Sequence, residues 1–259
     1  GAYTVALLAI YSDLDIWFTL PLAGGAAALI AAFLCFPLLR MTQFYFLIGS
    51  FAAGEAIRLI WVEWVSLFGG TSGLRGAEAP ILWGIDFLDP IPYFYFVLGV
   101  VGFCLFILYR IENSRIGLTL HAIHWKASLA ESVGVDAWRY RALAFIIGSF
   151  FVGIAGGLKI HYLGAVTPNQ FTVGFMVFIL IWVIVGGYNR FYGPIIGVVV
   201  LTVFDESIRD FEIIRPAIYG AMLIASILFL PLGLESVPGK IKVWFGIGSS
   251  PKEPPLTDR

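Results

Sequence analysis

The residues of this chain that could do chemistry lie in two places, each set against long apolar runs. The first is the pair Glu55 and Arg58, three residues apart within such a run. On a helix the two side chains share one face and can form an ion pair. Ionisable groups inside a membrane span are functional candidates by default, but Trp61 and Trp64 place this pair near the end of its run. The sequence therefore leaves open whether Glu55 and Arg58 contact a substrate or form a structural ion pair.

The second place is the polar segment 110–141, which holds five of the chain's sixteen Lys and Arg residues. Its two histidines are spaced like part of a metal site, but two ligands without a third nearby do not predict zinc. Apolar residues recur there at spacings of three and four, which predicts an amphipathic helix that ends before Gly134. They are Ile116, Leu120, Ile123, Ala127 and Ala130, with His121, His124, Ser128 and Glu131 on the adjacent face. The residues alone leave open whether this helix meets a soluble partner or lies on the lipid headgroups.

Several kinds of chemistry have no motif in the sequence. There is no G-x-x-x-x-G-K-[ST], so nucleotide binding would have to come from another subunit. No nucleophile and base stand in a pattern that suggests hydrolysis, and we expect neither an enzyme nor a cofactor. Cys35 and Cys104 lie inside apolar runs and predict small buried side chains, without a disulfide or a metal site.

The elements that carry these groups are predicted to be membrane spans. Hydrophobic residues make up 59% of the chain and charged residues 13%, about half the charged fraction typical of soluble domains. A net charge of −1 offers no basic field for nucleic acid. Eight apolar runs predict membrane segments, of which the charged run 43–67 is the weakest candidate. The runs are 1–11, 17–39, 43–67, 91–109, 142–160, 172–187, 192–207 and 214–231.

The distribution of Lys and Arg orients these segments. Eleven of the sixteen basic residues fall in every second connection, which the positive-inside rule places in the cytoplasm. Lys159 and His161 are expected at the external membrane interface, near the end of their run. The cytoplasmic connections lie at Arg40, 110–141, Arg190 and 232–259; the external ones lie at 12–16, 68–90, 161–171 and 208–213, with only Arg75 and Arg209 among them.

Paired glycines predict close contact between helices. Gly153 with Gly157, and Gly193 with Gly197, each lie one turn apart on a helical face. In a lipid environment such faces let two helix backbones approach each other closely.

Many short motifs, in order and spacing, resemble one family across nearly the whole chain. They include Gly1-Ala-Tyr-Thr, Glu55-Ala-Ile-Arg58, Gly69-Gly-Thr-Ser-Gly-Leu74, Ser114-Arg-Ile-Gly117, Gly153-Ile-Ala-Gly-Gly-Leu158, His161-Tyr-Leu-Gly164, Arg215-Pro216 and Pro231-Leu-Gly-Leu234. The sequence is similar to the LivM-type membrane subunits of branched-chain amino acid ABC importers.

That resemblance implies an all-α fold, a polytopic transmembrane helical bundle with about eight membrane segments in one permease domain, 1–259. It implies a cytoplasmic coupling loop at 113–138, whose short helix and glycine turn dock on an ATPase, and a cytoplasmic tail at 232–259. The best match to the family's Glu-Ala-Ala…Gly pattern in that loop is Ala130, Glu131, Ser132 and Gly134.

The resemblance also implies a function and a set of partners. The protein is expected in a bacterial or archaeal cytoplasmic membrane, the inner membrane of bacteria that have two, as part of the pathway for branched-chain amino acids. A second related permease, two cytoplasmic ATPase subunits that hydrolyse ATP and an external substrate-binding protein would complete the importer. Near relatives carry urea, amides or other amino acids, so the substrate stays open. The alternative from another class is an ion-coupled secondary transporter, which should show inverted repeats with ionisable residues at mid-membrane.

The sequence also departs from the family pattern. Further helices usually precede this point, which predicts that the chain is truncated at its N-terminus. His121, His124 and Trp125 stand where the family tends to carry arginines and an acidic residue. These differences are expected to alter contacts with partners without removing the pattern.

Overall fold

The computed structural model describes residues 1–12, 15–41, 43–76, 81–82, 85–86, 89–187, 190–207, 218 and 220–221. They belong to two compact units, Gly1–Val173 and Gly174–Arg259. The expected tail 232–259, and all but three residues of the run 214–231, lie outside the described residues.

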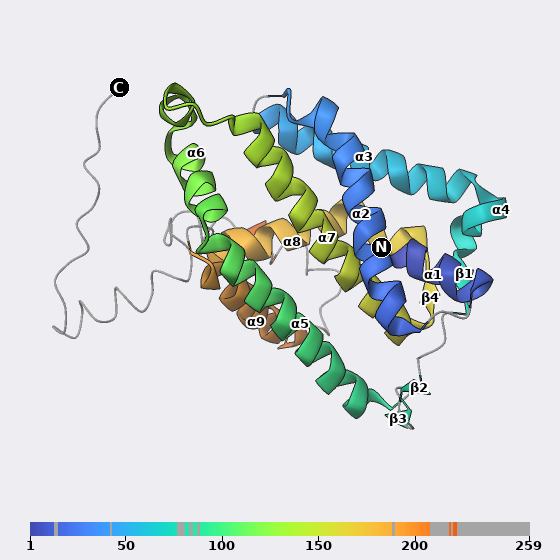
Figure 1. Ribbon diagram of the computed structural model, residues 1–259. Coiled ribbons are helices and arrows are strands. Elements are labelled where there is room, and N and C mark those ends of the chain that lie inside the picture. The colour runs from blue at the N-terminus through green and yellow to red at the C-terminus, as the bar shows by residue number, and fades with distance from the viewer. Residues whose placement is uncertain are drawn as a thin grey trace, which may run out of the picture. The chain divides into compact units, whose positions relative to one another are not determined.

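Among the described residues, helices dominate both units (Figure 1). The first unit contains α1 (Ala2–Tyr11), α2 (Ile16–Leu38), α3 (Gln43–Glu63), α4 (Val65–Phe68), η1 (Gly70–Ser72), β1 (Leu74–Arg75), β2 (Ile81–Leu82), β3 (Ile85–Asp86), α5 (Pro90–Glu112), α6 (Arg115–Ser132), α7 (Ala137–Leu163), β4 (Ala165–Val166) and η2 (Pro168–Phe171). α8 (Val173–Gly186) begins at the boundary, and α9 (Tyr192–Ser207) follows it.

Five of the described helical segments are long and apolar enough to cross a membrane. The charged run 43–67 is among them, because its helix α3 stays apolar from Tyr45 to Glu63. α1 is a shorter apolar helix of 10 residues, and α9 has 16 residues. The prediction of eight membrane segments is therefore supported for five, which are Ile16–Leu38, Tyr45–Glu63, Pro90–Glu112, Ala137–Leu163 and Pro168–Gly186.

The centre of the first unit is the contact between α2 and α7, with α1 packed against both. Gly24 and Gly153 face each other there, and a methyl group added to Gly153 would lie 2.6 Å from Ala27 Cβ and 2.7 Å from the Ala23 carbonyl oxygen. The two backbones can approach this closely only because both positions lack a side chain. The expected helix contact at Gly153 is confirmed.

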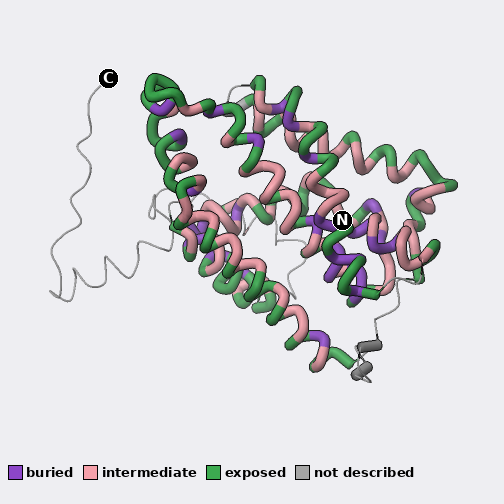
Figure 2. The backbone as a smooth tube through the Cα atoms, viewed as in Figure 1, coloured by how far each residue is buried: buried purple, intermediate pink, exposed green. Residues whose placement is uncertain are grey.

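Buried residues gather where α1, α2 and α7 meet, whereas the described residues of α3 include none that is buried and α5 has only Tyr93 (Figure 2). Val5, Ala23 and Ile160 form the main cluster, and Ile16, Leu20 and Leu158 form a second one beside α5. α3 and α5 show many large apolar side chains to the surroundings of the chain, as membrane helices do when lipid or another protein covers them.

A short strand pair and a group of aromatic contacts join the ends of these helices. β1 pairs antiparallel with β4, with Leu74 opposite Val166. Gly73, just before β1, has φ 70° and passes so close to the Val166 carbonyl that no side chain would fit there. Beside this ladder, the Tyr3 ring lies 4.4 Å from the Trp61 ring and meets Phe68 edge to face, which ties α1 to the end of α3 and to α4.

In the second unit, α8 and α9 pack through glycine in the same way. A methyl group on Gly197 would lie 2.7 Å from the Gly186 Cα atom, so the two backbones touch. Ile181, Val185 and Leu201 bury their side chains beside this contact. The predicted close approach at Gly197 is confirmed.

Candidate functional site

The polar segment between α5 and α7 folds as the helix α6. Ser114 caps its start, because the Ser114 hydroxyl accepts a hydrogen bond from the Ile116 amide at 3.2 Å. The helix is broken at Lys126, where φ is −157° and ψ is 90°. Two arms result, one before and one after this residue, where the sequence pattern predicts a single continuous helix.

The apolar stripe of α6 faces the rest of the chain, as the spacing predicts. Ile123 from the first arm and Ala130 from the second are both buried against Ala137, in the first turn of α7. Ala127, Val135 and Tyr140 pack around them. Asp136 caps α7 by accepting a hydrogen bond from the Arg139 amide, and its carboxylate also pairs with the Arg139 side chain at 2.9 Å. The segment thus packs against the start of α7.

A second apolar face of α6 has no cover from the described residues. The exposed fractions are 78% for Trp125, 64% for Leu129 and 77% for Val133. Trp125 ends the first arm, Leu129 lies in the second arm and Val133 directly follows it, and we call these three exposed residues the outer ridge. The apolar residue types at every fourth position are a sequence signal for this surface. It was not predicted because the longer stripe through Ile123 and Ala130 accounts for one apolar face of the helix.

The four residues of the predicted coupling motif do not all face the same way. Ala130 is 6% exposed and is used in packing within the chain. Glu131, Ser132 and Gly134 are exposed beside the outer ridge. Gly134 ends the helix with φ 87°, its amide donates a hydrogen bond to the Glu131 carbonyl at 3.0 Å, and nothing lies within 4 Å of the place a side chain would begin.

The histidines of α6 lie apart from any cluster of metal ligands. The His121 Nε2 atom is 3.6 Å from Glu112 Oε1, and the His124 ring lies 6.4 Å from the Trp125 ring. Within the described ranges, no three His, Cys, Asp or Glu side chains gather closely enough to hold a metal ion.

Glu55 and Arg58 meet in the second half of α3. The Arg58 Nε atom donates to both carboxylate oxygens of Glu55 at 2.9 Å, and its Nη2 atom also donates to Oε1, so the pair is bidentate. The exposed fractions are 33% for the Glu55 side chain and 18% for that of Arg58. Of the residues around them on α3, none is buried. This ion pair therefore lies on a helix that the described residues of the chain cover only partly.

A polar contact that the sequence did not predict joins α2 to α7. His161 is 5% exposed, and its Nε2 atom lies 3.1 Å from the Thr19 hydroxyl, which is also buried. Because α2 covers that side of α7, the His161 side chain packs inside the chain and does not reach out to the headgroups; its depth in the membrane stays a prediction. Lys159 lies partly buried, with its amine 5.3 Å from the centre of the Phe171 ring.

Comparison with known proteins places this arrangement in a family. The family model for the branched-chain amino acid transport system permease component matches residues 1–230. The high-affinity branched-chain amino acid transport system permease protein LivM of Salmonella typhimurium is 30% identical over 257 residues, covering 90% of this chain and 60% of that protein. LivM of Escherichia coli is 29% identical over the same shares.

More distant relatives carry a second permease name. The probable branched-chain amino acid transport permease protein LivH of Methanocaldococcus jannaschii is 27% identical over 158 residues, covering 57% of this chain and 48% of that protein. No solved structure matches the chain. The chain spans about 60% of the length of the curated LivM proteins it matches. A match over residues 1–230, together with five helices able to span a membrane, shows that the chain belongs to the branched-chain amino acid transport permease family and is a multi-pass protein of the cytoplasmic membrane.

Proposed function

We propose that this chain is the permease subunit of an ATP-binding cassette importer and forms part of the pathway for branched-chain amino acids. ATP would be hydrolysed on two cytoplasmic partner subunits. A second, related permease and an external substrate-binding protein would complete the assembly. The occurrence of both LivM and LivH names among the relatives supports a pathway built from two kinds of permease chain.

The outer ridge of α6 is the observation that carries this proposal. An interfacial helix on the headgroups needs one apolar face, and α6 already uses one to pack on α7. The ridge is a second apolar face, with an exposed tryptophan and polar neighbours such as Ser128 and Glu131. Aromatic and aliphatic side chains surrounded by polar ones are typical of protein interfaces. We infer that the ridge, with Glu131, Ser132 and Gly134, is the surface that meets the ATPase.

The packing of α6 offers a route from that surface into the membrane. Its two arms lie against the start of α7 through Ile123, Ala130 and Ala137. α7 in turn packs along α2 and against α1, the most buried part of the first unit. A displacement of α6 by a closing ATPase would therefore move α7 as a rigid element together with its neighbours.

The ion pair of α3 supports a polar route through the same assembly. Facing acyl chains, an ionised pair would be costly, and ionisable groups in spans usually face a bundle interior or a water-filled cavity. We therefore propose that the Glu55 and Arg58 side of α3 faces the second permease and the pathway between the two chains. A zwitterionic amino acid carries both charges that such a pair can attract.

The test is uptake and ATP hydrolysis by the reconstituted assembly, with Leu129→Asp as the variant. A charge in the centre of an apolar interface removes the burial of a leucine, about 1.5–3 kcal/mol, and adds a desolvated carboxylate. ATPase association and leucine uptake should both fall. Thr119→Asp is the matched control, because it adds the same charge to the first arm of α6, away from the outer ridge, and should leave both unchanged.

Different outcomes separate the alternatives. Leucine uptake that persists without ATP and disappears with an ionophore would replace this proposal with an ion-coupled transporter. Competition by urea or amides, but not by leucine, isoleucine or valine, would move the substrate to another class within the same family. Normal ATPase association in Leu129→Asp would mean that the ridge lies on lipid and not on the ATPase.

A further inference from the structure

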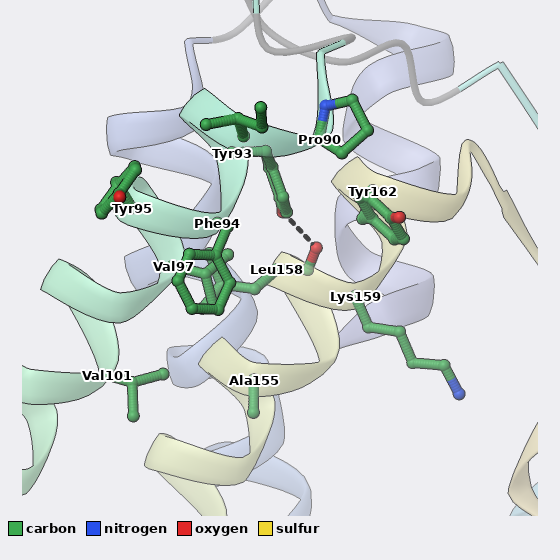
Figure 3. A pocket seen from close by; sticks show the side chains of 11 residues that line it. Pro90, Tyr93, Phe94, Tyr95, Val97, Val101, Ala155, Leu158, Lys159 and Tyr162 are labelled. Carbon is green, nitrogen blue, oxygen red and sulfur yellow. Dashed lines mark hydrogen bonds between the residues drawn. The ribbon is translucent and has the colours of Figure 1, made fainter. Parts of the chain in front are cut away.

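A cavity of about 870 Å3 opens between α5 and α7. Its walls come from residues 90–101 of α5 and 155–162 of α7, and Figure 3 shows it from close by. Val97, Val101 and Ala155 form its aliphatic part. Tyr95 and Tyr162 stand at the end where α5 begins and α7 ends, and both are largely exposed. The cavity thus has a tyrosine end and an aliphatic end.

The tyrosine that joins the two walls is already engaged. The Tyr93 hydroxyl donates a hydrogen bond to the Leu158 carbonyl oxygen, and the Tyr93 ring stacks on Tyr162 with ring centres 5.4 Å apart (Figure 3). α5 and α7 are therefore held together at this end. The cavity lies beside that contact, between α5 and α7.

The lining does not suit an amino acid. Among the described residues that line the cavity there is no carboxylate to receive an ammonium group. Lys159 is the charged member of that set, and its side chain points away from Tyr93, with the amine near the Phe171 ring (Figure 3). A zwitterion placed here would lose its hydration without a partner for its positive charge, which is a large cost.

The position of the cavity suits a lipid. Both walls are membrane spans, and the predicted orientation puts Pro90 and Leu163 at the external surface. Tyr95 and Tyr162 then lie at headgroup level, where amphipathic aromatic rings are enriched. From Tyr93 to Val101 the helix rises roughly 12 Å towards the middle of the membrane, at about 1.5 Å per residue. Beyond Tyr95, the α5 residues that line the cavity along that depth are the apolar Val97 and Val101.

We propose that this cavity binds one acyl chain of a phospholipid from the external leaflet. The chain lies between Val97, Val101 and Ala155, and the ester or phosphate oxygens of the lipid accept hydrogen bonds from the Tyr95 and Tyr162 hydroxyls. The lipid fills the space between α5 and α7 where the protein leaves it open. This site is separate from the outer ridge of α6 and does not depend on which solute the permease carries.

The experiment is native mass spectrometry of the full-length permease in its purified assembly, counting retained phospholipids. The variant is Ala155→Phe, whose ring would occupy the aliphatic end. The matched control is Val152→Phe, one turn away on α7 at a position that is exposed and outside the cavity. Wild type and Val152→Phe should each retain a phospholipid that Ala155→Phe has lost. Adding leucine to the wild type should leave the retained phospholipid in place.

A second measurement uses the unmodified protein, so that it does not depend on how well a variant folds. A phospholipid with a photoreactive group in the middle of one acyl chain should label residues 90–101 and 155–162 in intact membranes. Equal lipid retention in Ala155→Phe and Val152→Phe would overturn the proposal. So would displacement of the lipid by leucine, or protection of both segments from labelling because another protein segment fills the groove.

Discussion

Replacing Gly134 should separate ATP hydrolysis from transport. The residue ends the second arm of α6 with φ 87°, a backbone conformation that a non-glycine residue adopts at a cost of roughly 1–2 kcal/mol. Nothing lies within 4 Å of the added Cβ, so the cost that we assign to Gly134→Leu is that of the backbone. The helix packing in the membrane should therefore survive.

The substitution of Gly134 should change the surface next to the turn. Val133 and Glu131 precede Gly134, and relaxing the backbone changes where the end of the outer ridge points. A cost of roughly 1–2 kcal/mol lowers the population of the native turn by about 5–30-fold, because 1.4 kcal/mol is a factor of ten in an equilibrium. Against a stability of about 5–15 kcal/mol for a whole domain this is small. For a surface that must fit a partner it is large.

The assay is leucine uptake and ATP hydrolysis in reconstituted vesicles, with purified yield and thermal unfolding as checks of folding. Gly134→Leu should keep its yield and its melting temperature and lose most of its uptake. Gly134→Asn is the matched control, because asparagine tolerates positive φ far better than leucine. Full-rate uptake in Gly134→Leu, with normal ATPase association, would refute the role assigned to this turn.

Two further predictions concern the bundle and its orientation. Single cysteines at Ser72 and Ser128, both exposed, should be labelled from opposite sides of the membrane, Ser72 by an external reagent; external labelling of Ser128 alone would invert the predicted topology. Thr19→Val should lower the free energy of unfolding by about 0.6–1.7 kcal/mol, the range of interhelical hydrogen bonds in membranes, because it removes the His161 contact at 3.1 Å. Thr19→Ser keeps the hydroxyl and should unfold in detergent closer to wild type; equal stability of Thr19→Val and wild type would contradict a stabilising hydrogen bond.

Features with a local signal could be predicted from the sequence. The inward face of α6 followed from the spacing of Ile123, Ala127 and Ala130, and the close packing at Gly153 and Gly197 followed from small residues one turn from another glycine. The i, i+3 spacing of Glu55 and Arg58 predicted their contact. Each of these depends on residues within one or two turns of the same helix.

Features that depend on distant residues could not be predicted. The partner of His161 is Thr19, 142 residues away in the sequence, so the burial of that histidine was hidden until α2 was placed against α7. The break at Lys126 has no local signal either, since lysine is a good helix former and no glycine or proline is near it. The coupling role of Ala130, Glu131, Ser132 and Gly134, and a pathway role for Glu55 and Arg58, stay predictions.

The break at Lys126 has a consequence for how this segment can change over evolutionary time. In an unbroken α-helix, inserting one residue turns everything beyond it by about 100°, because there are 3.6 residues per turn. An insertion in the first arm of α6 would then point the outer ridge in a new direction. At Lys126 the backbone leaves the helical conformation, so the direction of the side chains in the second arm is not fixed by the first arm. The packing of Ala130 on Ala137 sets that direction instead. Length differences ahead of Lys126 can be absorbed there, while Leu129 and Val133, the part of the outer ridge beyond the break, keep their direction.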